Sequence, residues 1–248
     1  VISTSTRNVV QTVTLGGSLT SAIAITPNGA KAWAVDANSA GTIYVIDTTT
    51  YSVGVFNPVG STALNDIAFT PDGLEAWLTD IAHKSVVVID ARTYGILATI
   101  SIGGSSSPED IAISPDGRQA WVTDNADGLI RTFDVASRTP LAQLPIAAGL
   151  GGIAFTPDGR QAWVTSGPGA QAISVDVSSG TATDTVPTGL TPVAVAVSSD
   201  GRRVFVANRM GNSVTVIDVP STTIDTGGPV PTAPLQSFSV PAGTQAQQ

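Results

Sequence analysis

The chain consists largely of short runs in which apolar, β-branched and aromatic residues fill four to eight positions between clusters of Gly, Pro, Asn and Asp. Such runs are typical of β-strands bounded by turns. One set of strands, labelled A to D in chain order, is expected at 66–70, 76–79, 85–90 and 96–102. No stretch shows the i, i+3, i+4, i+7 apolar spacing of an amphipathic helix. The pattern predicts an all-β chain and excludes a solenoid of helical repeats.

These strands recur as a unit repeated five times. Each unit contains a Pro-Asp-Gly turn or a close variant, in which proline presets φ and glycine accepts a positive φ. The turn glycines are 44, 44, 42 and 42 residues apart: Gly29, Gly73, Gly117, Gly159 and Gly201. An aromatic residue stands four positions after each glycine: Trp33, Trp77, Trp121, Trp163 and Phe205. A period of about 40–45 residues with four short strands is that of a propeller blade.

We therefore expect a β-propeller of four-stranded antiparallel blades over residues 1–241. Five full blades are expected at about 20–60, 64–104, 108–148, 150–190 and 193–241, after a half blade (strands C and D) at 1–17. The last blade contains a Pro- and Thr-rich insertion at 220–234, and 242–248 resembles a tail or linker. Because an incomplete ring leaves sheet edges bare, we expect a longer parent chain, a partner that completes the propeller, or additional strands from 220–233 and the tail.

Two recurrent residues have structural roles. Each tryptophan is expected to fill the space between neighbouring blades. Each strand C ends in an aspartate, which is expected to accept hydrogen bonds from the amides of the following turn. These aspartates are Asp47, Asp90, Asp134, Asp176 and Asp218. Replacing Asp90 with Ala is therefore expected to lower stability without affecting a ligand site.

The second strand of several units contains a related motif: AWLTD at 76–80, AWVTD at 120–124 and VFVAN at 204–208. These segments resemble the Tyr-Val-Thr-Asn signature of YVTN β-propeller repeats, and the GNSVTVID segment at 211–218 strengthens the resemblance. The resemblance covers about residues 1–240 and implies a propeller in an exported or cell-surface context. Relatives include surface-layer modules, lactonase-like proteins and quinoprotein or cytochrome-linked propellers, so the resemblance does not imply one activity.

The composition limits the classes of binding partner that are expected. The net charge is −8, and only Lys31 and Lys84 are lysines. An acidic, lysine-poor chain disfavours nucleic acid and anionic membranes. No apolar run reaches the roughly 18 residues of a membrane span, and the absence of cysteine excludes disulfides and thiolate sites. The composition suits an extracellular, cell-surface or periplasmic protein of bacterial or archaeal type.

The loops joining strands B to C and D to A are expected to share one face, where ligand sites of propellers usually lie. The acidic residues Asp66, Glu109 and Asp110 could form a patch there with Asp80 and Asp124. Calcium prefers such oxygen ligands, so Asp66, Asp110 and Asp124 are candidate metal ligands, although no cofactor is otherwise expected. The alternative is that these residues cap turns. The candidate ligand-binding face comprises Asp66, His83, Lys84, Glu109, Asp110, Asp124, Asp127 and Arg209.

No catalytic residues stand out. His83 is the only histidine, so a multi-histidine metal or haem site is excluded. The regular blades with small loops favour a non-catalytic interaction or structural module that binds a protein or surface polymer. The alternative is a lactonase-like hydrolase assisted by a divalent cation, or a subunit of a redox propeller enzyme. Stoichiometric metal that is lost in Asp66→Ala and Asp110→Ala would favour the hydrolase.

Overall fold

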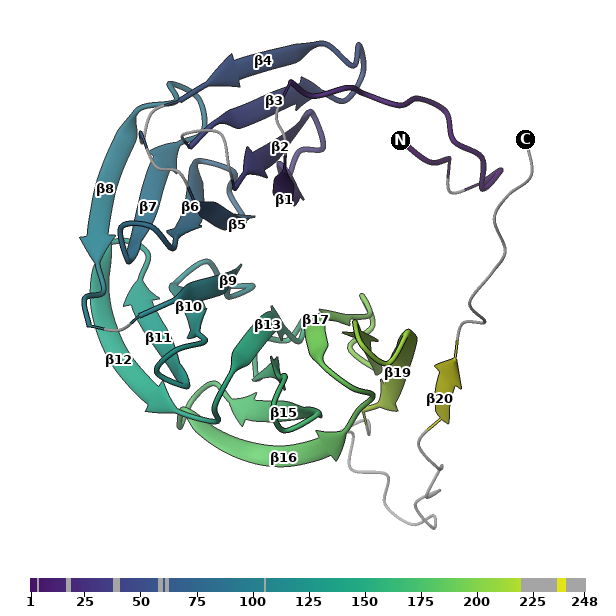
Figure 1. The fold of residues 1–248 in the computed structure, drawn as a ribbon. Coiled ribbons are helices and arrows are strands. Elements are labelled where there is room, and N and C mark those ends of the chain that lie inside the picture. Colours follow the sequence, from purple (N-terminus) through teal and green to yellow (C-terminus); the bar gives the residue numbers. More distant parts are fainter. Residues whose placement is uncertain are drawn as a thin grey trace. The chain divides into compact units, whose positions relative to one another are not determined.

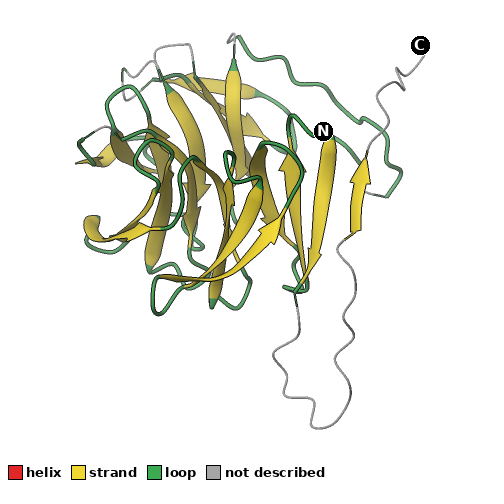
Figure 2. Ribbon diagram, turned by 60° about the horizontal axis from the view of Figure 1, so that its bottom comes forward, coloured by secondary structure: helices red, strands yellow, loops and turns green. Residues whose placement is uncertain are grey.

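The computed structural model describes residues 1–3, 5–16, 19–37, 41–57, 60, 63–104, 106–219 and 236–239. All regular secondary structure in these residues is β-strand, drawn as yellow arrows in Figure 2. The strands form five four-stranded antiparallel sheets, which confirms the predicted blades. None of the described segments forms a helix long and apolar enough to cross a membrane. The chain divides into two compact units, residues 1–99 and 100–248.

The first unit contains two sheets, in which the strands pair in chain order (Figure 1). The first sheet is formed by β1 (Thr20–Ile25), β2 (Lys31–Asp36), β3 (Ile43–Asp47) and β4 (Val53–Phe56). The second is formed by β5 (Leu64–Phe69), β6 (Glu75–Asp80), β7 (Ser85–Asp90) and β8 (Ile96–Ser101).

The second unit contains the other three sheets, each with the same order of strands. They comprise β9 (Pro108–Ile113), β10 (Gln119–Asp124), β11 (Leu129–Asp134) and β12 (Thr139–Pro145); β13 (Leu150–Phe155), β14 (Gln161–Ser166), β15 (Gln171–Asp176) and β16 (Thr181–Pro187); and β17 (Pro192–Val197), β18 (Arg203–Asn208), β19 (Ser213–Asp218) and β20 (Gln236–Ser239). The last of these confirms the predicted final strand. The proposed insertion at 220–234 and the tail at 242–248 lie outside the described residues.

Local hydrogen bonds explain why the strands turn where they do. In the turn between β5 and β6, the Asp72 carboxylate accepts bonds from the Thr70 hydroxyl at 2.6 Å and the Leu74 amide at 3.0 Å. Gly73 has a φ of 70°, which only glycine adopts without strain. At the end of β7, one oxygen of Asp90 accepts the amides of Arg92 and Thr93, both at 2.8 Å. The predicted turn role of Asp90 is confirmed.

The four tryptophans are buried, as expected, and at most 4% exposed. Trp33 packs edge-on against Phe69 of the next sheet, with ring centroids 5.3 Å apart. Trp121 meets Phe155 in the same way at 5.3 Å. Neighbouring sheets within a unit are therefore held together by the aromatic residue of strand B. Phe205, at the same place in β18, is 38% exposed.

The predicted N-terminal half blade is not formed as a sheet. In the described part of residues 1–17, the only pairing is a single bridge between Ile2 and Val9. Backbone hydrogen bonds from Ser3 N to Asn8 O and from Val10 N to Val1 O flank this bridge, but no ladder of strands forms.

Candidate active site

The last residue of strand B is polar in all five sheets and is at most 2% exposed: Asp36, Asp80, Asp124, Ser166 and Asn208. Asp80 and Asp124 were expected in a surface acidic patch, and the structure corrects this. Each carboxylate is buried because the chain reverses directly after it, and the amides of the reversing loop need an acceptor. His83 N donates to Asp80 Oδ1 at 3.1 Å, and Asp127 N donates to Asp124 Oδ1 at 3.3 Å.

In the third and fifth blades, the partner of this buried residue comes from strand C, across the hairpin. In the third blade it is Arg131, and in the fifth it is Thr215, whose hydroxyl lies 3.0 Å from Asn208 Nδ2. In the first blade, Tyr44 occupies the matching position, where burial and then the charge of Asp36 raise the pKa of its phenol. The matching position of strand C is thus polar in the first, third and fifth blades. In the fourth blade it is Ile173, and Ser166 Oγ instead donates to the Ala148 carbonyl at 2.8 Å.

The second blade departs from this pattern. The matching position of strand C holds Val87, which cannot pair with a carboxylate. Asp80 is instead paired with the loop residue His83, whose Nδ1 lies 2.9 Å from Asp80 Oδ2. The Asp80 side chain is 1% exposed and that of His83 is 58% exposed. A buried carboxylate thus orients an accessible imidazole.

This pair has the chemistry of a general base. A carboxylate that accepts the Nδ1–H bond fixes the tautomer in which Nε2 carries the lone pair. Because the His83 side chain is 58% exposed, a water molecule can reach the ring and give Nε2 a proton. Lys84 follows directly, exposed and with a φ of 51°, so a positive charge stands beside the imidazole in sequence. Asp66, also in the first unit, is half-buried, and its amide donates to Thr79 Oγ1 at 2.9 Å.

In the second unit, Asp124 is part of a buried ionic cluster. Arg131 Nε donates to Asp124 Oδ2 at 2.8 Å, and Arg131 Nη2 donates to Asp127 Oδ2 at 2.7 Å and to Ser106 Oγ at 3.1 Å. The Ser107 amide completes the shell of Asp124 at 2.9 Å. Burial raises the pKa of Asp124, but the bonds from Ser107, Arg131 and Asp127 outweigh it, so the net pKa is lowered. The cluster joins the loops on either side of β9 and β10 and is structural.

The remaining candidates also lie in the second unit. Asp110 accepts the amide of Ile153 in the next sheet at 2.8 Å, so its carboxylate joins β9 to β13. Glu109 is half-buried, with Ser107 Oγ 3.5 Å from its Oε1. Arg209 is exposed, and its amide donates to the Thr191 carbonyl at 2.9 Å. Within this unit the structure brings Asp124 and Asp127 together through Arg131.

The three candidate metal ligands do not assemble into a ligand set. Among the described residues, no group of three His, Asp or Glu side chains lies close enough to hold a metal ion. The carboxylate of Asp110 accepts a hydrogen bond from a backbone amide, and that of Asp124 accepts bonds from a backbone amide and from Arg131. Calcium binding by Asp66, Asp110 and Asp124 stays a prediction without geometric support.

Arg131 and Ser106 are the site residues that sequence reasoning missed. A signal for Arg131 was present, because β11 reads Leu-Ile-Arg-Thr-Phe and a charge inside an apolar strand is uncommon unless it is paired. The sequence does not show which carboxylate pairs with Arg131, because several acidic residues come shortly before it in the chain.

The sheets and their aromatic packing define a β-propeller protein, and the Asp80–His83 pair gives it a candidate hydrolytic base. Residues 104–233 match the family described as lactonase, 7-bladed β-propeller, and the chain belongs to this family. Among curated proteins none is significantly similar in sequence. The prediction of a non-catalytic interaction module is wrong, because the family match supports the alternative, a lactonase-like enzyme. The propeller family is thus confirmed, whereas the YVTN repeat type stays a prediction.

Solved structures agree on the fold. A candidate 6-phosphogluconolactonase from Bacteroides uniformis has a TM-score of 0.71 and 18% identity, over 89% of this chain and 70% of that one. A protein of unknown function from Desulfotomaculum acetoxidans has a TM-score of 0.73 and 22% identity, over 85% and 68%. The Cps50 (Swd1) β-propeller domain of Myceliophteria thermophila has a TM-score of 0.77 and 13% identity, over 94% and 74%. At these identities the likeness establishes the fold alone.

Proposed function

We propose that the protein hydrolyses lactones, opening a cyclic ester to a hydroxy acid, with His83 as the general base. The observation that carries the reaction class is the match of residues 104–233 to the lactonase propeller family. The 6-phosphogluconolactonase name of one structural neighbour supports a sugar-acid lactone as the first substrate to test. The assignment of the base rests on the Asp80–His83 geometry.

The proposed hydrolysis requires only residues of this chain and one water molecule. His83 Nε2 takes a proton from the water while its oxygen attacks the lactone carbonyl, which forms a C–O bond and a tetrahedral oxyanion. Collapse of this intermediate breaks the ring C–O bond. The imidazolium returns its proton to the leaving alkoxide, and the product is a hydroxy acid. The Asp80 carboxylate, 2.9 Å from Nδ1, orients the imidazole and stabilises the imidazolium, as the carboxylate of a Ser-His-Asp triad does.

Lys84 is the group we assign to substrate charge. It is exposed, follows His83 directly and is one of only two lysines in a chain of net charge −8. An ammonium at this place would attract the oxyanion of the intermediate, or a phosphate or carboxylate borne by the substrate. Replacing Lys84 with Ala should therefore raise KM more for an anionic lactone than for a neutral one.

The test is lactone hydrolysis by the purified chain, followed by acid release at constant pH and corrected for spontaneous ring opening. Glucono-δ-lactone, its 6-phosphate and γ-butyrolactone serve as substrates. We expect His83→Gln and Asp80→Asn to lower kcat/KM by about 10²–10⁴-fold. Asp184→Asn is the control, because this exposed residue of β16 lies in the other unit. Circular dichroism of each variant shows whether it is folded.

The outcomes separate the reaction from the residue. No hydrolysis of any of the three lactones by the wild-type chain would refute the proposed function. Hydrolysis that persists unchanged in His83→Gln would keep the function and refute His83 as its base.

A further inference from the structure

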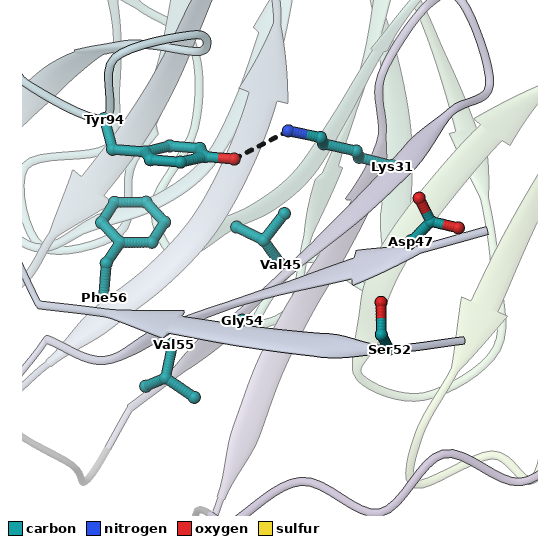
Figure 3. A pocket seen from close by; sticks show the side chains of 8 residues that line it. All are labelled: Lys31, Val45, Asp47, Ser52, Gly54, Val55, Phe56 and Tyr94. Carbon is teal, nitrogen blue, oxygen red and sulfur yellow. Dashed lines mark hydrogen bonds between the residues drawn. The ribbon is translucent and has the colours of Figure 1, made fainter. Parts of the chain in front are cut away.

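A second candidate site lies in the first unit, beside β3 and β4, and shares no residue with the Asp80–His83 pair. A pocket of about 330 Å³ opens there, within the size range of small-molecule sites. Figure 3 shows the rings of Phe56 and Tyr94 on one side of it and the polar groups of Asp47 and Ser52 on the other, with Lys31 reaching across to Tyr94. The residues come from β2, from β3 and β4 with the turn between them, and from the turn between β7 and β8.

The aromatic side of this pocket is a fixed platform. The rings of Phe56 and Tyr94 lie 4.8 Å apart at an angle of 32°, and both pack against the buried Trp33. Tyr94 holds a φ of 62°, which is costly for a bulky residue. In the fourth blade, glycine occupies the matching place in the turn, Gly180, with a φ of 67°. Tyr51 and Arg138 hold the same turn position in the first and third blades, with φ of 60° and 56°, so the positive φ belongs to this turn and does not single out Tyr94. What distinguishes Tyr94 is that its ring packs on Phe56 and Trp33.

Lys31 departs from a pattern seen in the neighbouring blades. In the next two blades the residue two positions before the tryptophan accepts its indole N–H: Glu75 takes the bond of Trp77 at 2.9 Å, and Gln119 takes that of Trp121 at 2.7 Å. An ammonium cannot accept, and Trp33 Nε1 is buried without a partner. Trp163 Nε1 also lacks one, although Gln161 has an amide oxygen that a side-chain rotation can supply. Positions that break a local rule at a cost in stability are expected at functional sites.

The polar groups of the pocket have capacity to spare. The Lys31 ammonium has three N–H donors, and one of them donates to Tyr94 Oη at 2.7 Å. Its Nζ lies 5.3 Å from the centroid of the Tyr94 ring. The three bonds that Asp47 accepts from Thr49 and Thr50 all go to Oδ1, so Oδ2 can accept from a ligand. Ser52 adds a hydroxyl. Donors and acceptors therefore stand together beside an aromatic face.

We propose that this pocket binds a neutral polyhydroxylated ring, a single sugar unit, at a site separate from the lactone site. A sugar has C–H faces that pack on aromatic rings and hydroxyl groups that both donate and accept. Its hydroxyls can accept from Lys31 and donate to Asp47, so each charge is matched. A ligand with a net charge would be opposed by one of the two. The open pocket and its short list of contacts place the affinity in the millimolar range.

Gly54 offers a clean way to close the pocket. It lies between Ser52 and Phe56 on the same face of the strand, and a Cβ added there would contact only the Val45 carbonyl oxygen, at 3.8 Å. Its φ is not positive, so a side chain brings no backbone strain. Gly54→Phe should fill the pocket without removing a partner of the fold.

The experiment titrates methyl glucoside, methyl galactoside and methyl mannoside into the full chain, using saturation-transfer NMR and calorimetry. We expect at least one to bind saturably, with affinity lowered about tenfold or more in Gly54→Phe and in Tyr94→Gly. Arg138→Gly is the matched control, because Arg138 holds the same turn position with a φ of 56° and lies in the other unit. Its affinity for the sugar should equal that of the wild type.

Three results would overturn the proposal: no saturable binding up to about 100 mM, which is far above the expected Kd; binding that Gly54→Phe leaves unchanged; or tighter binding of glucuronic acid or glucosamine than of the neutral glycosides. An oligosaccharide that binds more tightly than its methyl glycoside would support the site as one that holds a unit of a polymer. Lactone hydrolysis should be unchanged in Gly54→Phe, so failure of either proposal is read independently of the other.

Discussion

Arg131 Nε donates to Asp124 Oδ2 at 2.8 Å, and both side chains are buried, at 8% and 0% exposure. The ion pair crosses a hairpin and is completed by the amide of Ser107, which lies 17 residues before Asp124. A buried pair of this kind is costly to break, because the charge left behind has neither water nor partner.

We therefore expect Arg131→Met to lower the free energy of unfolding by about 3–5 kcal/mol. The double variant Asp124→Asn with Arg131→Met should be less destabilised than this single variant, since asparagine still accepts the loop amides and carries no charge. Urea unfolding of the two proteins measures the difference. A loss below about 1 kcal/mol in Arg131→Met would show that water replaces the guanidinium.

The turn aspartates set the response of stability to acid. Hydrogen bonds from the Thr93 and Arg92 amides lower the pKa of Asp90, and Asp47, Asp134 and Asp176 are lowered by the same kinds of turn donors. Because the folded pKa lies below the unfolded value of about 3.9, the folded state binds fewer protons in this range. Stability should be fully present above about pH 5 and fall as the pH drops through 4 toward the folded pKa.

Thermal unfolding between pH 7 and pH 3 checks this. The variant in which all four turn aspartates are replaced by Asn should show a shallower decline in Tm below pH 4. Equal slopes would mean that other groups control acid unfolding. Asp90→Ala should lower Tm at pH 7, whereas Asp184→Ala, on an exposed strand position, should leave it unchanged.

The acceptor before each tryptophan is also testable. Glu75 accepts the Trp77 indole N–H at 2.9 Å, and Trp77 is fully buried. Glu75→Lys should cost about 1–3 kcal/mol, because it leaves a buried donor without a partner. Glu75→Gln keeps an acceptor and should be close to neutral. Chemical denaturation measures the free energy of unfolding of both variants. Equal losses in the two would show that the negative charge of Glu75 matters, rather than its bond to the indole.

The last prediction concerns the close packing of β13 and β17. A Cβ at Gly152 of β13 would lie 2.8 Å from Ala194 Cα and 2.9 Å from Val195 N of β17. Since both contacts are backbone, Gly152→Ala should destabilise the protein by about 1–3 kcal/mol. Gly54→Ala meets only one atom, at 3.8 Å, and is the control. If the two variants have the same Tm, the two strands can separate at little cost.

Functional residues were harder to find than the fold. His83 was named, but as one member of a loop face, because a single histidine was weighed against multi-histidine metal sites. A general base needs one imidazole and one orienting carboxylate, and Asp80 is three residues away. Nothing in the sequence says that Asp80 is buried and His83 exposed, and this difference makes the pair chemically useful.

The sequence alone determined the features that depend on neighbours along the chain. The Gly73 turn and the Asp90 turn rest on contacts within three residues, so their residue types report them directly, and the regular spacing of these turns reveals the blade repeat. Tertiary structure decided what depends on distant partners. Asp124 is buried rather than exposed because Ser107 and Arg131 close over it, and Lys31 meets Tyr94 across 63 residues of sequence. A residue type limits which bonds a side chain can form, but only packing decides which partners and how much water surround it.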